Sequence, residues 1–313
     1  MTRRSLPWRA AASLACLAAV AGCAVDSAEK TAPPPSLFFD DFTYATPADM
    51  AATGWQLRDG TGHPGLPGGR FGADAISLQD DPASPGNRVL RMTARTDGTG
   101  PGTVQAQLCH QRKYLQGTYA ARIRFSDAPR SGVDGDPVIE SFYAVAPLAH
   151  PFDPDFSELD WEYLPNGGWG SDKTRLYGVS WQTVQIDPWE AHNSAHEEFR
   201  SFDGWHVLLM QVTRNAVHEF VDGREVAVHD GRNVPVSPMT ISFNLWFAVG
   251  GTLPAGGTPR VYDEDIDWVF HAKDAVLSPA EVDAQVRALR AGHVGRRDTV
   301  PAPNPPQQQR CDI

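Results

Sequence analysis

Short runs of alternating apolar and polar residues, separated by turn signals, fill the chain from residue 37 to 270. A period of two places successive side chains on opposite faces of a β-strand. Strands are therefore predicted at 37–43, 87–94, 104–110, 117–125, 137–145, 156–164, 176–185, 205–212, 217–221, 225–228, 239–249 and 266–270. So many strands in one domain need two stacked sheets, because a single open sheet of that size curls or splits.

One helix is predicted near the C-terminus. Residues 278–281 read Ser-Pro-Ala-Glu, a capping box with proline at the first helical position. Val282, Val286 and Leu289 follow as a stripe at helical spacing, and we expect them to pack at the edge of the sandwich. The tail from Arg296 onward is rich in proline and glutamine, and is expected to be irregular.

Three carboxylates alternate with large apolar residues over positions 158–163. On a strand, Glu158, Asp160 and Glu162 share one face, with neighbours about 7 Å apart. Such a row of like charges opposes folding unless it is solvated, binds a metal or serves a reaction. The structural alternative is a charge ladder facing solvent, but the apolar reverse face indicates a strand packed on a core. Two carboxylates flanking a sugar are the catalytic equipment of a glycoside hydrolase.

A second acidic alternation lies at residues 263–267. Asp263, Asp265 and Asp267 have the same spacing, but Glu264 interrupts the apolar face between them. Aspartate side chains are also shorter than glutamate side chains and converge less easily on one sugar. We expect this run to form a charged turn that leads into the last strand.

Composition and charge narrow the class of protein. The 313 residues carry a formal net charge of −11, which argues against nucleic acid and anionic membranes as partners. Glycine (28) and proline (26) are plentiful, as is typical of an all-β domain with many turns. Residues 37–275 have the length of one such domain, and residues 276–313 form a helix and tail.

The first 23 residues have the pattern of an export signal. Three arginines precede a short apolar stretch over 10–22, which is too short to span a membrane. Residues 20–23 read Val-Ala-Gly-Cys and resemble a bacterial lipobox, in which Cys23 becomes the lipidated first residue. An ordinary cleaved signal peptide, which frees the protein, is the alternative. Proline-rich residues 24–36 are predicted to be a tether, so we expect an exported protein that contacts the membrane only through a lipid on Cys23.

Two of the four cysteines belong to the folded part of the chain. Cys16 and Cys23 lie in the export signal, which leaves Cys109 and Cys311. In an oxidising compartment these two can form a disulfide that holds the C-terminal tail to the domain. Two unpaired thiols are the alternative.

The acidic strand carries a family resemblance. Glu-Leu-Asp-Trp-Glu at 158–162 resembles the Glu-x-Asp-x-Glu signature of glycoside hydrolase family 16, the group of lichenases, laminarinases and xyloglucan transglycosylases. Similar segments follow the family order at 38–42, 117–123, 205–206, 220–223 and 267–269. The resemblance covers residues 37–271 and implies an all-β, antiparallel jelly-roll sandwich of the concanavalin A type. The chain has no extra residue before the last glutamate, so it resembles the bulge-free, lichenase-like form.

The resemblance also implies roles for the acids. Glu158 takes the nucleophile position, Asp160 the assisting position and Glu162 the acid/base position of a retaining endo-glycosidase. In such an enzyme the two working carboxyl groups lie about 5–5.5 Å apart. The implied substrate is a neutral, β-glucan-like polysaccharide, and the enzyme is expected to be a monomer. A transglycosylase, or a non-catalytic carbohydrate-binding protein on the same fold, remains an alternative.

Aromatic residues and one aspartate complete the candidate site. Trp181 and Trp246 lie on strands that resemble cleft-lining strands of the family, and Trp169 lies near the acids in sequence. Their flat faces can stack on sugar rings. No cofactor is expected in catalysis. Family members often hold a structural Ca²⁺ near the last strand, which makes Asp267 the candidate ligand.

Overall fold

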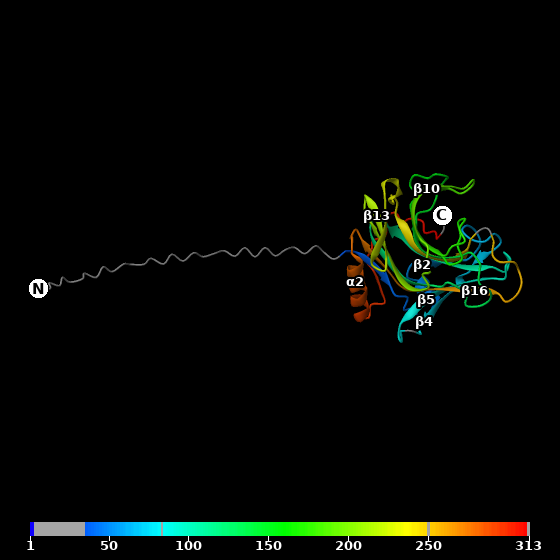
Figure 1. The fold of residues 1–313 in the computed structure, drawn as a ribbon, viewed down its shortest axis with the longest axis horizontal. Coiled ribbons are helices and arrows are strands. Elements are labelled where there is room, and N and C mark those ends of the chain that lie inside the picture. Colours follow the sequence, from blue (N-terminus) through cyan, green and yellow to red (C-terminus); the bar gives the residue numbers. More distant parts are fainter. Residues whose placement is uncertain (3–34, 83, 249–250, 312–313) are drawn as a thin grey trace. The chain divides into compact units, whose positions relative to one another are not determined.

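The computed structural model describes residues 1–2, 35–82, 84–248 and 251–311 (Figure 1). The chain divides into two units, Met1–Pro34 and Pro35–Ile313, and the second contains every element described below. The predicted export signal, Cys23 and most of the tether lie outside the described residues. Within the described residues, no helix is long and apolar enough to cross a membrane.

Two antiparallel layers make up the folded unit. The front sheet contains β2 (Trp55–Leu57), β6 (Val104–Tyr114), β8 (Val138–Val145), β9 (Glu158–Leu164), β10 (Arg175–Gln185), β11 (Glu190–Glu198) and β15 (Met239–Phe247). The rear sheet contains β1 (Leu37–Asp40), β3 (Arg70–Phe71), β4 (Ile76–Asp80), β5 (Arg88–Thr96), β7 (Gly117–Phe125), β12 (Gly204–Val212), β13 (Ala216–Val221), β14 (Arg224–Asp230), β16 (Arg260–Lys273) and β17 (Arg296–Asp298). The helices are α1 (Pro47–Ala51) and α2 (Pro279–Ala291), with short 3₁₀ turns at Ala73–Ala75 and Gly231–Asn233.

The strand order places the acidic strand inside the front sheet. That sheet runs β2–β6–β15–β8–β9–β10–β11, with every neighbour antiparallel. In the rear sheet, β14–β13–β12–β7–β16 are consecutive, and β5 and β1 share the remaining edge of β16. The first residues of β6 also pair with β3 and β5, which joins the two layers. The predicted all-β antiparallel sandwich is therefore confirmed.

The core lies between the sheets and consists of aromatic and branched side chains. Trp161 of β9, Phe142 of β8 and Phe243 of β15 face Phe125 and Ile266 of the rear sheet in one buried cluster. Alternation along each strand produces this layer, because every second residue points inward. The other face of the front sheet is left for the acids.

Helix α2 has the predicted start but a different position. The Ser278 hydroxyl accepts a hydrogen bond from the Glu281 backbone N–H, and the Glu281 carboxylate accepts one from the Ser278 backbone N–H. These two bonds complete the capping box. Val282, Val286 and Leu289 are buried, as the stripe predicts. They pack with residues such as Trp268 on the outer face of the rear sheet, not at the sandwich edge. The sequence shows which helix face is apolar, but it does not show which surface that face covers.

Some elements depart from the sequence prediction. The acidic run at 263–267 lies inside the long strand β16, so the expectation of a charged turn is wrong. The short elements β2, β4 and α1 and the nine-residue strand β11 were not predicted. β11 lacks an apolar face (Glu-Ala-His-Asn-Ser-Ala-His-Glu-Glu), and its pairing with β10 makes it a strand. β17 within the expected irregular tail is likewise held by pairing, with β1.

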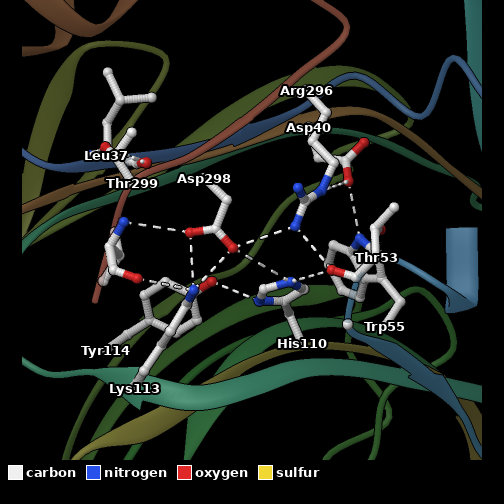
Figure 2. Close-up of polar contacts among 12 residues, drawn as sticks. Leu37, Asp40, Thr53, Trp55, His110, Lys113, Tyr114, Arg296, Asp298 and Thr299 are labelled. Carbon is white, nitrogen blue, oxygen red and sulfur yellow. Dashed lines mark hydrogen bonds and ion pairs between the residues drawn. The ribbon is translucent and has the colours of Figure 1, made fainter. Parts of the chain in front are cut away.

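A buried polar network holds β17 against β6 and β1 (Figure 2). The ammonium group of Lys113 donates to both carboxylate oxygens of Asp298 at 2.8 Å and to the Val300 carbonyl at 3.0 Å. Arg296 lies 3.2 Å from Asp298 and 3.8 Å from Asp40. Burial lowers the pKa of His110 in this network to about 3, so its ring is neutral. The start of the C-terminal segment is thereby tied to the sandwich.

Candidate active site

Strand β9 presents the three acids on one face and a packed apolar face on the other. Residues 158–164 pair without a register shift with β10 on one side, and residues 158–163 do so with β8 on the other. This regular pairing is the bulge-free form that the spacing predicted. Leu159, Trp161 and Tyr163 are buried in the core, so Glu158, Asp160 and Glu162 must point to the opposite face.

A cavity of about 560 Å³ lies over these acids. Its lining runs from Gln107 on β6, through β15, β8, β9 and β10, to Asn193 on β11. The cavity therefore crosses the strands of the front sheet, and the three acids lie along β9 within it. None of the described residues that line it is lysine or arginine.

Burial and mutual repulsion shift the titration of the acids upward. Burial, aided by the charge of Glu162, raises the pKa of Glu158 to about 8 from an ordinary 4.5. Burial also raises the pKa of Glu162 to about 7, although Trp169 and Arg175 act to lower it. Asp160 has its pKa raised well above the usual range by burial and by both glutamates. The three groups titrate as a coupled set, which retains protons near neutral pH.

Two indole N–H groups bond to the acids. Trp181 of β10 donates to Asp160, and Trp169 donates to Glu162 at 3.1 Å. No described residue donates a hydrogen bond to Glu158, which lines the cavity. The acids thus differ in environment: two are held by tryptophans and the third is left open to a ligand.

The loop after β9 brings Trp169 over the site. Trp169 has φ +47°, a left-handed backbone conformation that is uncommon for a bulky side chain. Arg175 donates to the Gly168 carbonyl at 2.8 Å and supports this turn. The Trp169 ring lies 5.7 Å from the ring of Trp246, which also lines the cavity. Trp169, Trp181 and Trp246 therefore all lie at the cavity, where the sequence analysis expected them.

Several lining residues were missed by the sequence analysis. The strand register places Tyr143 of β8 beside Asp160, and Ser141 of β8 beside both Glu162 and Asn244 of β15. Trp189, by contrast, is among the tryptophans that the sequence offers as stacking surfaces; it is 58% exposed and lies 6.2 Å from Trp181 at the β11 end. Alternation within 137–145 marks Ser141 and Tyr143 as members of one face. Only the pairing with β9 identifies that face as the acidic one.

The second acidic run differs from the first in its partners. Asp263 pairs with Arg130, Asp265 with Arg91, and Asp267 with Arg122 and Arg290. Each of these carboxylates is neutralised by a nearby guanidinium. The β9 acids have no such ion pair among the described residues, although Arg175 acts on Glu162 at longer range. Equal spacing in the sequence thus leads to opposite electrostatics.

The surroundings of Asp267 do not fit a calcium ion. Its Oδ1 accepts from Arg290 at 2.7 Å and from Asn87 at 2.8 Å, and its Oδ2 accepts from Arg122 at 2.7 Å. Burial opposes ionisation, but Arg290 outweighs that effect and the pKa of Asp267 is lowered. Calcium requires six to eight oxygen ligands, whereas cationic and amide N–H donors surround this carboxylate.

The two cysteines of the folded part form a disulfide. Cys109 on β6 is bonded to Cys311 near the C-terminus, with their Cα atoms 5.2 Å apart. Cys311 also lines the cavity. The bond therefore brings the C-terminal segment to the acidic face of the front sheet.

Comparison with known proteins supports the fold. No protein-family model matches the chain, and no curated protein matches its sequence. Among solved structures, a Bacillus licheniformis β-glucanase superposes with a TM-score of 0.54 at 17% identity, covering 76% of this chain and 98% of that one. A lichenase derived from a mouse hindgut metagenome superposes with a TM-score of 0.52 at 20% identity, covering 76% of this chain and 99% of the lichenase. A GH16 protein of the Bacteroides ovatus mixed linkage glucan PUL, in complex with a G4G4G3G product, superposes with a TM-score of 0.55 at 16% identity. The superposition covers 74% of this chain and 98% of that protein.

This chain has the fold of those glucanases. The shared fold is the jelly-roll sandwich that the family resemblance implied. At these identities the likeness concerns the fold, and the chemistry is argued from the site itself.

Proposed function

We propose that this protein is a retaining endo-glycosidase that cleaves a neutral β-glucan. The observation that carries the proposal is the row of Glu158, Asp160 and Glu162 at the base of a cavity that crosses the sheet. Both glutamates have pKa values raised toward neutral pH as one interacting pair, so the pair holds a proton there while one group is ionised. The order of the two values would ionise Glu162 first, so the roles of the two glutamates are taken from the family resemblance and not from their pKa values. The fold shared with glucanases agrees with this chemistry.

The proposed reaction has two steps. First, the Glu158 carboxylate attacks the anomeric carbon, the bond to the leaving sugar oxygen breaks, and Glu162 transfers its proton to that oxygen. Next, the Glu162 carboxylate takes a proton from water, which attacks the glycosyl ester and releases Glu158. Asp160, held by Trp181, lies between them and modulates the charge on both.

The nucleophile assignment has a direct test. Replacing Glu158 by Gln keeps its shape but removes the charge, so hydrolysis of lichenan or laminarin should fall by on the order of 10³-fold or more. Glu225→Gln on β14, outside the cavity, is the matched control and should keep full activity. Undiminished turnover in Glu158→Gln would overturn the assignment.

External anions separate the two glutamate roles. With an activated aryl β-glycoside and azide, Glu158→Ala should yield the α-glycosyl azide, because azide attacks in place of the missing nucleophile. Glu162→Ala should yield the β-glycosyl azide, because the covalent ester still forms and azide replaces water. The opposite stereochemistry would exchange the two roles.

The cavity lining supports a neutral substrate. Tryptophan and tyrosine rings offer flat apolar surfaces to sugar C–H groups, and the described lining contains no lysine or arginine to bind an anionic sugar. We expect turnover of laminarin, lichenan or another neutral glucan and none of alginate or pectate. Product analysis across such a panel identifies the linkage and reveals any sugar transfer.

We further propose export and lipid attachment at Cys23. The signal pattern supports this proposal, and the disulfide fits an oxidising compartment. Radiolabelled palmitate should label the wild-type chain and not Cys23→Ser when each is expressed in a bacterial host. Labelling of neither form would indicate an ordinary cleaved signal.

A further inference from the structure

The segment 301–311, here called the C-terminal strap, is fixed at both ends. At its start, Lys113 binds Asp298 and the Val300 carbonyl (Figure 2). At its end, Cys311 is covalently bonded to Cys109 and is only 3% exposed. The strap contains four prolines, which stiffen the chain between these anchors.

The end of the strap is bound by residues of the front sheet on its cavity face. The Cys311 carbonyl accepts from the Tyr143 hydroxyl and from Gln107 Nε2 at 2.8 Å. Gln107 Nε2 in turn lies 2.6 Å from the Tyr143 hydroxyl, and its Oε1 accepts from Arg58 at 2.6 Å. Gln309 donates to the carbonyls of Gly54 and Cys109 at 3.0 Å. These contacts hold the strap over β6 and β8.

The register locates the strap relative to the acids. Cys109 of β6 pairs with Ser242, Ser242 with Tyr143, and Tyr143 with Asp160. Cys109 is thus three strands from Asp160 at the same level, or about 14 Å. The Cys311 carbonyl accepts a hydrogen bond from Tyr143, which is the neighbour of Asp160 on β8. Cys311 therefore lies over the strands between Cys109 and Asp160. His63 and Pro64 line the cavity beside it, next to Arg58, which donates to the His63 carbonyl.

The other end of the cavity is built differently. There Trp189 is 58% exposed and Asn193 is exposed, both near the free edge formed by β11. Among the described residues, no disulfide anchors a segment at that end, although residues 148–156 pack against Trp181 and Val184 there. The two ends of the cavity therefore differ: the β6 end has a covalently anchored segment, and the β11 end has exposed side chains.

We propose that the C-terminal strap is an end wall of the cleft, which limits how many sugar units bind on the β6 side of Asp160. With fewer sugar units bound on that side, the products released from it are short and narrow in length. This inference rests on the proposed glycosidase function for its catalytic readout. Its binding readout is independent of turnover.

The test compares oligosaccharide length dependence with and without the strap. The variants are Cys109→Ser/Cys311→Ser, which frees the strap end, and a chain that stops after Val300. We expect kcat/KM for the longest glucan oligosaccharides to rise about threefold or more, with little change for the shortest. Longer products should appear alongside the narrow set. Dithiothreitol should reproduce the change in wild-type protein and leave the double serine variant unaffected.

Binding gives the second readout, followed by tryptophan fluorescence with glucan oligosaccharides of increasing length. Affinity should stop rising at a shorter length in wild-type protein than in the two variants. The same length dependence in all forms, or no binding by any, would overturn the wall, even if the variants melt at a lower temperature. Wild-type protein that binds glucans with this length limit but hydrolyses none would retain the wall and refute the glycosidase.

Discussion

At the scale of single residues, the site is defined by carboxyl groups that have no cationic partner in contact within the described part of the chain. A folded protein tolerates three acids on adjacent alternate positions either by pairing them or by keeping protons on them. The aspartates of β16 are paired with arginines, whereas the acids of β9 keep protons. Retained protons are what a general acid needs near neutral pH.

Stability should fall with rising pH because of these groups. The pKa of Glu158 is raised in the folded state, from 4.5 to about 8, so the folded protein binds protons that the unfolded chain has released in that interval. The free energy of unfolding therefore decreases as pH rises from about 4.5 to 8. Glu158→Gln should remove part of the decrease and be more stable than wild type by about 2 kcal/mol at pH 8, with little difference at pH 4. Urea titrations at both values measure this, and a wild-type advantage at pH 8 would contradict it.

The indole N–H of Trp181 should matter more for rate than for folding. Trp181→Phe keeps an aromatic face at the cavity but leaves Asp160 without its donor. We expect kcat to fall by about tenfold, in line with about 1.5 kcal/mol for the loss of one hydrogen bond. The pH optimum should move upward, because this contact lowers the pKa of Asp160. An unchanged pH profile would assign Trp181 to packing alone.

At the scale of elements, strand pairing decides which patterns become functional. β9 lies between β8 and β10, so its polar face is extended by Tyr143 and Trp181 into one surface. β16 lies in the rear sheet against β5 and β7, whose arginines meet its aspartates. The two acidic runs therefore differ in their surroundings: that of β9 faces a cavity, and that of β16 is paired with arginines.

The melting temperature of the protein should not depend on calcium. Both oxygens of Asp267 are occupied by arginine and asparagine donors, so neither EDTA nor Ca²⁺ should shift the melting temperature. Asp267→Asn should lower it, because Arg122 and Arg290 lose their counter-charge. A rise in melting temperature of several degrees with Ca²⁺ would contradict the arrangement.

At the scale of the whole molecule, distant parts of the chain converge on one cleft. Cys109 and Cys311 are 202 residues apart in sequence, yet they join on the same face of the front sheet as the acids, three strands from Asp160. The network in Figure 2 connects β1, β6 and β17 in the same way. The sandwich is thus closed by its own C-terminal segment.

The disulfide should contribute measurably to stability. It closes a long loop and so restricts the unfolded chain, and its loss should reduce the free energy of unfolding by about 2–4 kcal/mol. Cys109→Ala, Cys311→Ala and the double variant should lose similar amounts, since each removes the same bond. Chemical denaturation under non-reducing conditions measures the difference. Equal stability of wild type and double variant would show that the unfolded chain is not restricted by this bond.

The sequence by itself determined the local features: strands with a clear period of two, the capped helix, the acids on one face of β9 and the pair of cysteines in the folded part. These follow from short-range periodicity and chemistry, which a single segment contains. Only the tertiary structure decided that Ser141 and Tyr143 flank the acids, that α2 covers the rear sheet, and that the strap lies over the front sheet. Those facts depend on register between distant strands, and a segment's own pattern does not specify its partner.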